Sequence, residues 1–456
     1  MPVPSPQPGY ETIFNPATYN AANAPIVNAN GTITTTPTYS ATNGLMFNGV
    51  NGVPLNFTTE YWSYLSPSAG FAWDIFGDGK TALRGGYGIS YNNQPYQSFC
   101  ANQCAVNPPL IQTANLVTPS FPNPIGAASK APSLPSLNSE DLNDRTAQIQ
   151  TFSLSLEHQF AGSWFTSITG AGDLGRHETA LWNVNQPLPD PPYQFNPVIN
   201  AGTVTNYLYS PFYGFAGISQ IEPALNTNWY GLEVGVRHPV GHNVTLTIAY
   251  TWQHDLSQIR GNSLFDNEAG PANVYEPGDD YGNAAINVPQ SLSFGYIYNL
   301  PWYHDAHGLQ KQVLGGWRYS GLTTMESGFS QNPGLSVAHP GLSNRPNILP
   351  GVPVVGLKTV SNWFNTGAFV APPVGYFGNA APGDIYGPGL VDFDMAIYKD
   401  FHITEQHKLE FRAEAFNVFN HTNFNGVSTS VGSGTYGTIT SARDPRIFEF
   451  ALRYQF

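Results

Sequence analysis

The sequence predicts an all-β fold, an antiparallel transmembrane β-barrel with short periplasmic turns and long extracellular loops. Three observations predict this fold. Asp, Glu, Lys and Arg together make up only 10% of the 456 residues, whereas Phe, Trp and Tyr make up 14%. Segments of about ten residues alternate between apolar and polar side chains, as the strands of outer-membrane barrels do. The links between these segments are alternately short and long.

The low charge content indicates a surface that water does not wholly cover. A typical soluble protein has about 25% charged residues, and a disordered chain would be richer in charge and poorer in aromatic residues. No stretch approaches the roughly 20 consecutive apolar residues of a membrane helix. A closed β-barrel is then the remaining spanning structure. The net charge of −13 and the lack of a Lys/Arg cluster argue against a nucleic-acid partner.

The C-terminal segment 447–456 is the clearest strand. Successive side chains of a strand point to opposite faces, so the segment has one apolar and one polar side. The apolar side comprises Phe448, Phe450, Leu452, Tyr454 and Phe456, and the polar side comprises Glu449, Ala451, Arg453 and Gln455.

About eleven segments share this alternation, largely in pairs. They lie near residues 67–76, 80–91, 148–160, 163–174, 228–238, 243–253, 289–300, 316–327, 391–401, 407–418 and 446–456. Most links inside a pair are short, such as 77–79 and 161–163, although the link at 301–315 is longer. The links between pairs are long and polar, and a compact soluble domain would not sort its connections in this way.

Charged residues within the alternating segments are expected to face the barrel lumen, because a charge on the lipid face costs a few kcal/mol near the membrane midplane. There they would pair with one another along the wall, which we favour, or they would contact a plug or set solute preference. These residues are Arg84, Glu157, Glu233, Arg237, Glu410, Arg412, Glu414, Glu449 and Arg453.

The chain contains none of three common motifs of catalytic and nucleotide-binding sites, namely G-x-S-x-G, H-E-x-x-H and the P-loop. We therefore expect no enzyme activity, catalytic residue, cofactor or resident metal. His304, Asp305 and His307 lie in a link between strands, and Asp279 and Asp280 lie in a long loop. Solvated side chains are the favoured interpretation of both groups, with metal binding as the alternative.

The two cysteines, Cys100 and Cys104, are close enough in sequence to form a disulfide within one exposed loop in an oxidising compartment. The N-terminus has neither a basic region nor an apolar run, so it does not resemble a signal peptide. Since an outer-membrane protein requires one for export, we expect the chain to be a fragment.

Several segments resemble the barrel of Oar-like TonB-dependent receptors. LSPSAGFAWDIFGDGKTALRGGYGISY (65–91) resembles a barrel hairpin of that family, and FRAEAFNVFNHTNF (411–424) resembles its penultimate-strand segment. NVNQPLP (183–189), AYTWQHD (249–255), GWRYSG (316–321) and RPN (345–347) are also similar. Each match is short, but together they follow the family order from about residue 60 to 456.

The resemblance implies a C-terminal half of a 22-stranded barrel, preceded in the family by a regulatory-like domain and a plug that this sequence lacks. It divides the chain into 1–64, an incomplete barrel segment or extracellular loop, and 65–456, the receptor barrel. The implied location is the outer membrane of a Gram-negative-type bacterium. The implied partners are membrane lipid, the barrel assembly machinery, an unknown solute and, through the missing plug, the TonB system.

Two function classes compete with TonB-dependent nutrient uptake. One is a structural or adhesive surface barrel, or a non-functional fragment, in which the barrel merely displays its loops. The other is a secreted soluble β-protein, which the sorting of short and long connections disfavours.

Overall fold

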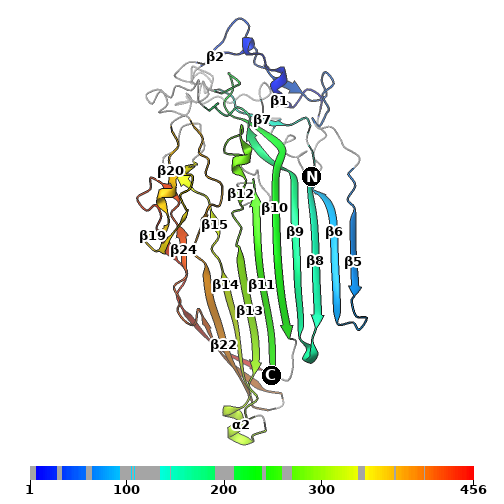
Figure 1. Cartoon of the computed structure of the whole chain (residues 1–456), viewed down its shortest axis with the longest axis vertical. Coiled ribbons are helices and arrows are strands. Elements are labelled where there is room, and N and C mark those ends of the chain that lie inside the picture. Colours follow the sequence, from blue (N-terminus) through cyan, green and yellow to red (C-terminus); the bar gives the residue numbers. More distant parts are fainter. Residues whose placement is uncertain are drawn as a thin grey trace, which may run out of the picture.

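We describe a computed structural model of the chain that covers residues 7–27, 33–57, 64–92, 104, 107, 134–143, 145–189, 210–238, 243–258, 270–303, 305–336, 345–373, 376–404 and 406–456. One large sheet of long strands forms the body, and the long connections fold together at one of its ends (Figure 1). In this described part, no helix has both the length and the apolar character needed to cross a membrane.

Eleven strands of the sheet follow one another in chain order, and every neighbouring pair is antiparallel. They confirm the predicted segments. They are β5 (Ser68–Asp74), β6 (Thr81–Asn92), β8 (Ala147–Gln159), β9 (Phe165–Asn183), β10 (Ile218–His238), β11 (Val244–Ser257), β13 (Gln290–Asn299), β14 (Trp317–Glu326), β22 (Leu390–His402), β23 (Lys408–Phe416) and β27 (Ile447–Gln455). Within the described residues the sheet is open, with β5 and β27 as its edges.

The register gives the sheet two chemically distinct faces. Paired residues on neighbouring strands project to the same side, so each row across the sheet belongs to one face. One row consists of Trp73, Leu83, Leu156, Ile168, Val234, Tyr250, Leu292, Met325 and Val391. The adjacent row, on the other side, consists of Ala72, Arg84, Ser155, Thr169, Glu233, Thr251, Ser291 and Glu326. We call these sides the apolar face and the polar face.

Short connections lie at the lower end of the sheet in Figure 1, which we call the turn end. In the β5–β6 turn, Gly77 and Gly79 have φ of 71° and 73°, a conformation that glycine adopts without steric cost. The Asp74 carboxylate accepts hydrogen bonds from both backbone amides, at 3.0 and 2.8 Å. The longer β13–β14 connection contains α2 (Gly308–Leu314), and the β8–β9 connection contains η5 (Ala161–Ser163).

The opposite end, which we call the loop end, carries short elements. Two strands join the large sheet there: β7 (Leu137–Glu140) pairs parallel with β10, and β12 (Gly282–Asn283) pairs with β11. The remaining strand pairs are β1 (Thr12–Phe14) with β4 (Leu45–Phe47), β2 (Ile26–Val27) with β3 (Ile33–Thr34), β15 (Ser330–Gln331) with β21 (Ile385–Tyr386), β16 (Gly334–Leu335) with β25 (Ser430–Val431), β17 (Asn347–Ile348) with β20 (Phe369–Val370), β18 (Val355–Thr359) with β19 (Asn362–Phe364), and β24 (Phe424–Val427) with β26 (Ile439–Ala442). The short 3₁₀ helices are η1 (Pro16–Thr18), η2 (Ala21–Asn23), η7 (Pro277–Asp280) and η8 (Thr366–Ala368).

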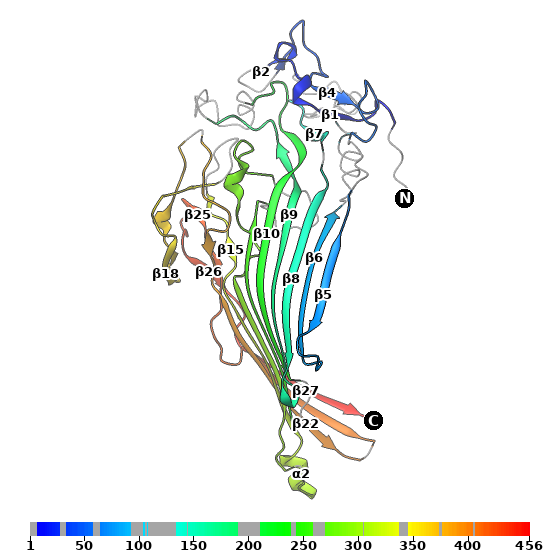
Figure 2. The same cartoon turned by 45° about the vertical axis from the view of Figure 1, so that its right-hand side comes forward.

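Most fully buried apolar residues gather at the loop end, in the long connections and in the parts of the sheet that they cover. Phe364, Phe369 and Ile385 anchor one cluster, whereas Phe14 and Ile218 belong to another. The strands β9 and β10, with 19 and 21 residues, extend into this region. A membrane strand needs only about 9–11 residues, so both strands are longer than one crossing requires, and their upper ends lie above those of β6 and β8 (Figure 2). The long connections therefore form a packed assembly, which we call the loop assembly.

Candidate functional site

The charged residues expected in the lumen all lie on the polar face of the sheet. The register pairs Arg84 with Ser155, Glu233 with Thr169 and Thr251, and Arg237 with Thr247. Glu157 lies in the next row of the same face, opposite Ala82. On the last two strands, Glu410 pairs with Arg453, Arg412 with Ala451, and Glu414 with Glu449. The strand register thus places all nine charged side chains on the polar face.

Several of these charges meet near the C-terminal edge of the sheet. The Arg412 guanidinium lies 3.6 Å from carboxylate oxygens of both Glu410 and Glu414. Arg318, which the sequence analysis missed, lies 3.8 Å from Glu410. The Tyr398 ring lies between the two guanidinium groups, 4.5 Å from Arg318 and 5.0 Å from Arg412, so each cation faces the ring. The tyrosine hydroxyl donates to Glu414 at 3.3 Å.

The other polar-face charges are spread over the sheet. Arg84 and Glu157 form an ion pair of 3.2 Å between β6 and β8. The Arg237 guanidinium lies 5.4 Å from the ring centre of Phe165 on β9. Pairing along the wall, the favoured interpretation, is thus present for Arg84 with Glu157 and for Arg412 with its two glutamates.

A hollow of about 430 Å³ lies on the polar face over β11, β13, β14, β22 and β23. It forms where Gly295, Ser320 and Ala396 place little side-chain volume. Asp394 and Glu414 contribute carboxylates to its lining, and the remaining lining is largely apolar. The lining of the hollow thus combines two carboxylates with largely apolar side chains.

Lys399 departs from the rule that strand charges occupy the polar face. It pairs with Trp317 in the register and lies on the apolar face, with only 1% of its surface exposed. Its ammonium group donates to the backbone oxygen of Gly315 at the turn end and lies 5.1 Å from the centre of the Phe401 ring. The long side chain therefore places its charge at the end of the strand, as lysine does near membrane interfaces.

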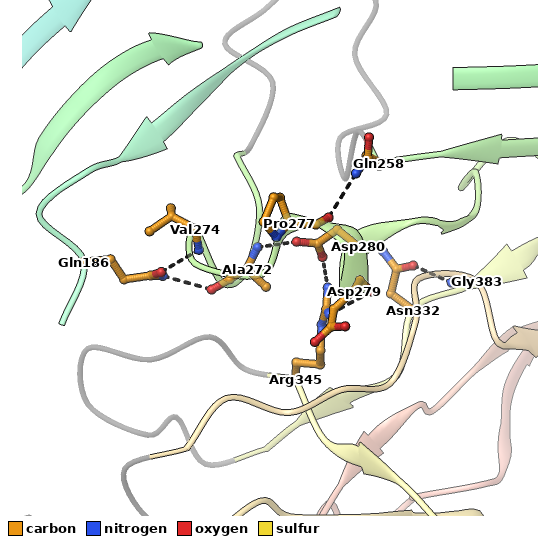
Figure 3. A network of polar contacts seen from close by, with 10 residues as sticks. All are labelled: Gln186, Gln258, Ala272, Val274, Pro277, Asp279, Asp280, Asn332, Arg345 and Gly383. Carbon is orange, nitrogen blue, oxygen red and sulfur yellow. Dashed lines mark hydrogen bonds and ion pairs between the residues drawn. The ribbon is translucent and has the colours of Figure 1, made fainter. Parts of the chain in front are cut away.

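In the loop assembly, Asp280 and Arg345 form a buried ion pair (Figure 3). Their side chains are 0% and 2% exposed. The Asp280 carboxylate also accepts the amide of Ala272 at 2.6 Å, and Arg345 donates to the backbone oxygen of Asp279 at 3.0 Å. The expectation that this acidic pair is solvated is therefore wrong for Asp280. The arginine that neutralises it lies in a different connection, where sequence spacing gives no signal.

Hydrogen bonds extend this contact across the loop assembly. Gln186 donates to Ala272 O and accepts from the Val274 amide, both at 2.9 Å. The Tyr275 hydroxyl donates to Gln186 O at 2.5 Å, and burial raises the pKa of Tyr275 to about 12. Burial also raises the pKa of Asp384, which Arg345 partly opposes. Three long connections are thus held together by polar contacts that are largely shielded from water.

The remaining predicted sites are less informative. Cys104 is fully buried with Ile13 and Phe57, whereas Cys100 lies outside the described residues, so their disulfide stays a prediction. His304 also lies outside them, and no group of three or more His, Cys, Asp or Glu in the described part is placed to hold a metal ion. On the edge strand β27 nearly every residue of both sides is exposed, and Tyr454 stacks on His407 with ring centres 5.8 Å apart. Phe448, Phe450 and Leu452 lie on the same side of this strand, and Phe456 follows its last residue.

Comparison with known proteins identifies the family. The model of the outer membrane beta barrel domain matches residues 6–449, and no curated protein matches the sequence. Similar solved structures include the outer membrane transporter YddB from Escherichia coli, with 9% identity and a TM-score of 0.46 over 84% of this chain and 39% of that one. The FrpB iron transporter from Neisseria meningitidis has 9% identity and a TM-score of 0.41 over 86% and 39%.

The ferripyoverdine receptor of the outer membrane of Pseudomonas aeruginosa has 11% identity and a TM-score of 0.38 over 86% of this chain and 32% of its own. The chain thus spans less than half the length of these structures. The family match covers nearly the whole sequence and agrees with the amphipathic antiparallel sheet. The chain belongs to the outer membrane β-barrel domain family, and its place is the bacterial outer membrane.

Proposed function

We propose that this chain is the C-terminal part of an outer-membrane transporter barrel, of the Oar-like TonB-dependent kind, that takes up a nutrient. The observation that carries the proposal is the amphipathic sheet of eleven strands, which has one apolar and one polar face. A packed loop assembly lies at one end of this sheet. In this proposal the apolar face contacts lipid and the polar face lines the lumen.

The strand count supports completion by further strands of a longer polypeptide. Because every neighbouring pair among the eleven strands is antiparallel, β5 and β27 run in the same direction. Joining these edges directly, or through a second copy facing the same way in the membrane, would require parallel pairing. An odd number of additional strands would pair antiparallel with both edges and give the even total typical of bacterial barrels. Open edges in lipid would leave backbone groups unsatisfied.

The division at residue 65 fits this scheme. No described residue before Ser68 contributes to the large sheet, and β1 to β4 lie at the loop end. In the transporter, residues 1–64 would form an extracellular connection, and 65–456 would form the barrel. Captured solute would pass the polar face, whose charges and acidic hollow supply its binding groups. A plug and its TonB contact would come from outside this chain.

Surface display is the second candidate, and one observation favours it. The hairpin β18–β19 at the loop end exposes Val355 and Leu357 to 73% and 75%. Apolar side chains exposed on a hairpin suit contact with another surface rather than with a soluble nutrient.

The test compares the source bacterium with a strain that lacks the gene, complemented or not by the full-length protein. Each culture grows in a defined nutrient mixture, and depletion of every solute is followed by mass spectrometry with and without a protonophore. Uptake predicts one solute class whose depletion requires both the gene and the protonmotive force. If depletion is unchanged while attachment of cells to surfaces falls, display is the function and the uptake proposal is wrong.

A further inference from the structure

Among the described residues at the turn end, the β13–β14 connection is the one that contains an α-helix. This helix, α2, has seven residues and lies beyond the ends of the strands in both views (Figures 1 and 2). None of its residues is buried. Leu309 and Val313, four positions apart and therefore on one side of the helix, are 79% and 56% exposed. Trp302 and Tyr303, just before it, are 62% and 51% exposed.

Two contacts fasten α2 to the apolar face of the sheet. The Trp317 indole donates to the backbone oxygen of Val313 at 3.0 Å. The Lys399 ammonium donates to the backbone oxygen of Gly315, directly after the helix. Trp317 and Lys399 are register partners on the apolar face, the face that lipid covers in an outer-membrane barrel. The helix is thus continuous with the lipid-contacting surface.

A helix of this length does not persist in water unless another surface packs against it. The described chain supplies only the two hydrogen bonds at its C-terminal end, and no buried side chain. Helical geometry places Lys311 opposite Leu309 and Val313, so one side is apolar and the other is cationic. Such a helix, flanked by Trp and Tyr, has the chemistry of a membrane interface with anionic phosphates.

We propose that α2, with Trp302 and Tyr303, is an interfacial anchor that binds phospholipid of the periplasmic leaflet. Leu309 and Val313 insert at the boundary between headgroups and acyl chains, while Lys311 faces the phosphates and water. The proposal rests on the outer-membrane location of the chain and not on nutrient uptake. It gives the longest periplasmic connection a role in fixing the depth and tilt of the barrel.

The test places a diazirine photo-crosslinking amino acid at Val313 of the full-length protein in its native outer membrane. The matched control carries it at Lys311, and the positive control carries it at Tyr250 on the apolar face. After irradiation, mass spectrometry identifies what is joined to each position. We expect phospholipid adducts at Val313 that approach those at Tyr250 and exceed those at Lys311 several-fold. Adducts mainly with protein, peptidoglycan or water at Val313 would overturn the proposal.

A second variant separates lipid contact from assembly. With the probe at Trp302, the double substitution Leu309→Asp and Val313→Asp should lower phospholipid adducts several-fold. Heat-modifiable gel mobility reports whether the barrel has assembled, and only assembled protein is compared. Unchanged adducts at Trp302 in assembled protein would show that the helix does not hold this segment in the membrane, and the anchor would be rejected.

Discussion

Arg345 and Asp280 form an ion pair whose side chains are almost completely removed from water, although they belong to different extracellular connections of the sheet. Such a pair contributes little compared with an apolar contact of the same volume, because both groups lose their hydration. Removing only one partner has a much larger effect, because it leaves a buried charge uncompensated. We therefore expect the pair to specify which connections lie together in the loop assembly.

We expect Asp280→Asn to loosen the loop assembly without unfolding the barrel. The amide oxygen can still accept from Ala272, but the charge of Arg345 is left buried, at a cost of about 3–5 kcal/mol. Hydrogen exchange of the full-length protein should accelerate in residues 270–287 and 345–348, while the strands stay protected. The control Asp279→Asn should have little effect, because only the backbone oxygen of Asp279 contacts Arg345. Equal exchange in both variants would contradict a clamping role.

The sheet was predictable from the sequence because lipid and lumen impose opposite requirements on alternate side chains. That constraint holds only where a strand crosses the membrane. In β10 the predicted start at residue 228 misses the upper part from Ile218, where Ile218, Ile221 and Leu225 are all buried. Bulges around Leu225 break the register there as well. Once both sides of a strand are packed, alternation no longer marks it.

The contacts of the loop assembly were not predictable for a different reason. Their partners are far apart in the sequence, and nothing in the spacing of Asp280 or Arg345 identifies the other. Lys399 shows a related limit, since a rule that places strand charges in the lumen ignores the reach of a lysine near a strand end. The face of the sheet on which a strand side chain lies follows from the local sequence pattern. The partner of a buried charged side chain depends instead on how distant segments pack together.

Two loops approach each other through their backbones at Gly383, and we expect Gly383→Ala to separate them. Gly383 has φ of +70°, and a Cβ there would lie 2.5 Å from both the Cβ and the O atom of Asn283. The control is Gly351→Ala, where φ is +76° but a Cβ meets nothing within 4 Å. Both variants bear a conformational cost of about 1–3 kcal/mol, but only Gly383→Ala adds a clash.

Limited proteolysis of the loop assembly measures this difference. Gly383→Ala should be cleaved faster than Gly351→Ala, and the acceleration should include the region of β12, which contains Asn283. Equal cleavage rates would mean that the loops have room to move apart without loss of structure.

The stability of the loop assembly should depend on pH through Asp384. Burial raises the pKa of this carboxyl, so the folded state binds a proton more readily than the unfolded state. The contribution of Asp384 to the free energy of unfolding is therefore fully present below the ordinary aspartate pKa. This contribution is lost as the pH rises through the raised pKa of the folded state. The protection of amides around β21, measured relative to their intrinsic exchange rates at each pH, should increase as the pH falls toward the ordinary aspartate pKa of about 4, and Asp384→Asn should reduce this dependence. An identical pH profile in the variant would exclude Asp384 as its source.

The assignment of the two faces can be tested with neighbouring residues of one strand. Tyr250 lies on the apolar face of β11 and Thr251 on the polar face. In the full-length protein, Tyr250→Arg should place a charge in lipid and cost about 2–4 kcal/mol near the midplane, so the heat-modifiable, assembled form should decrease. Thr251→Arg places the same charge beside Glu233, its register partner, and should leave assembly near the wild-type level. Because the two residues are adjacent, they lie at nearly the same depth in the membrane. A difference in assembly between the two variants therefore reports which face of the sheet each side chain occupies. A larger defect in Thr251→Arg would mean that the faces are assigned the wrong way round.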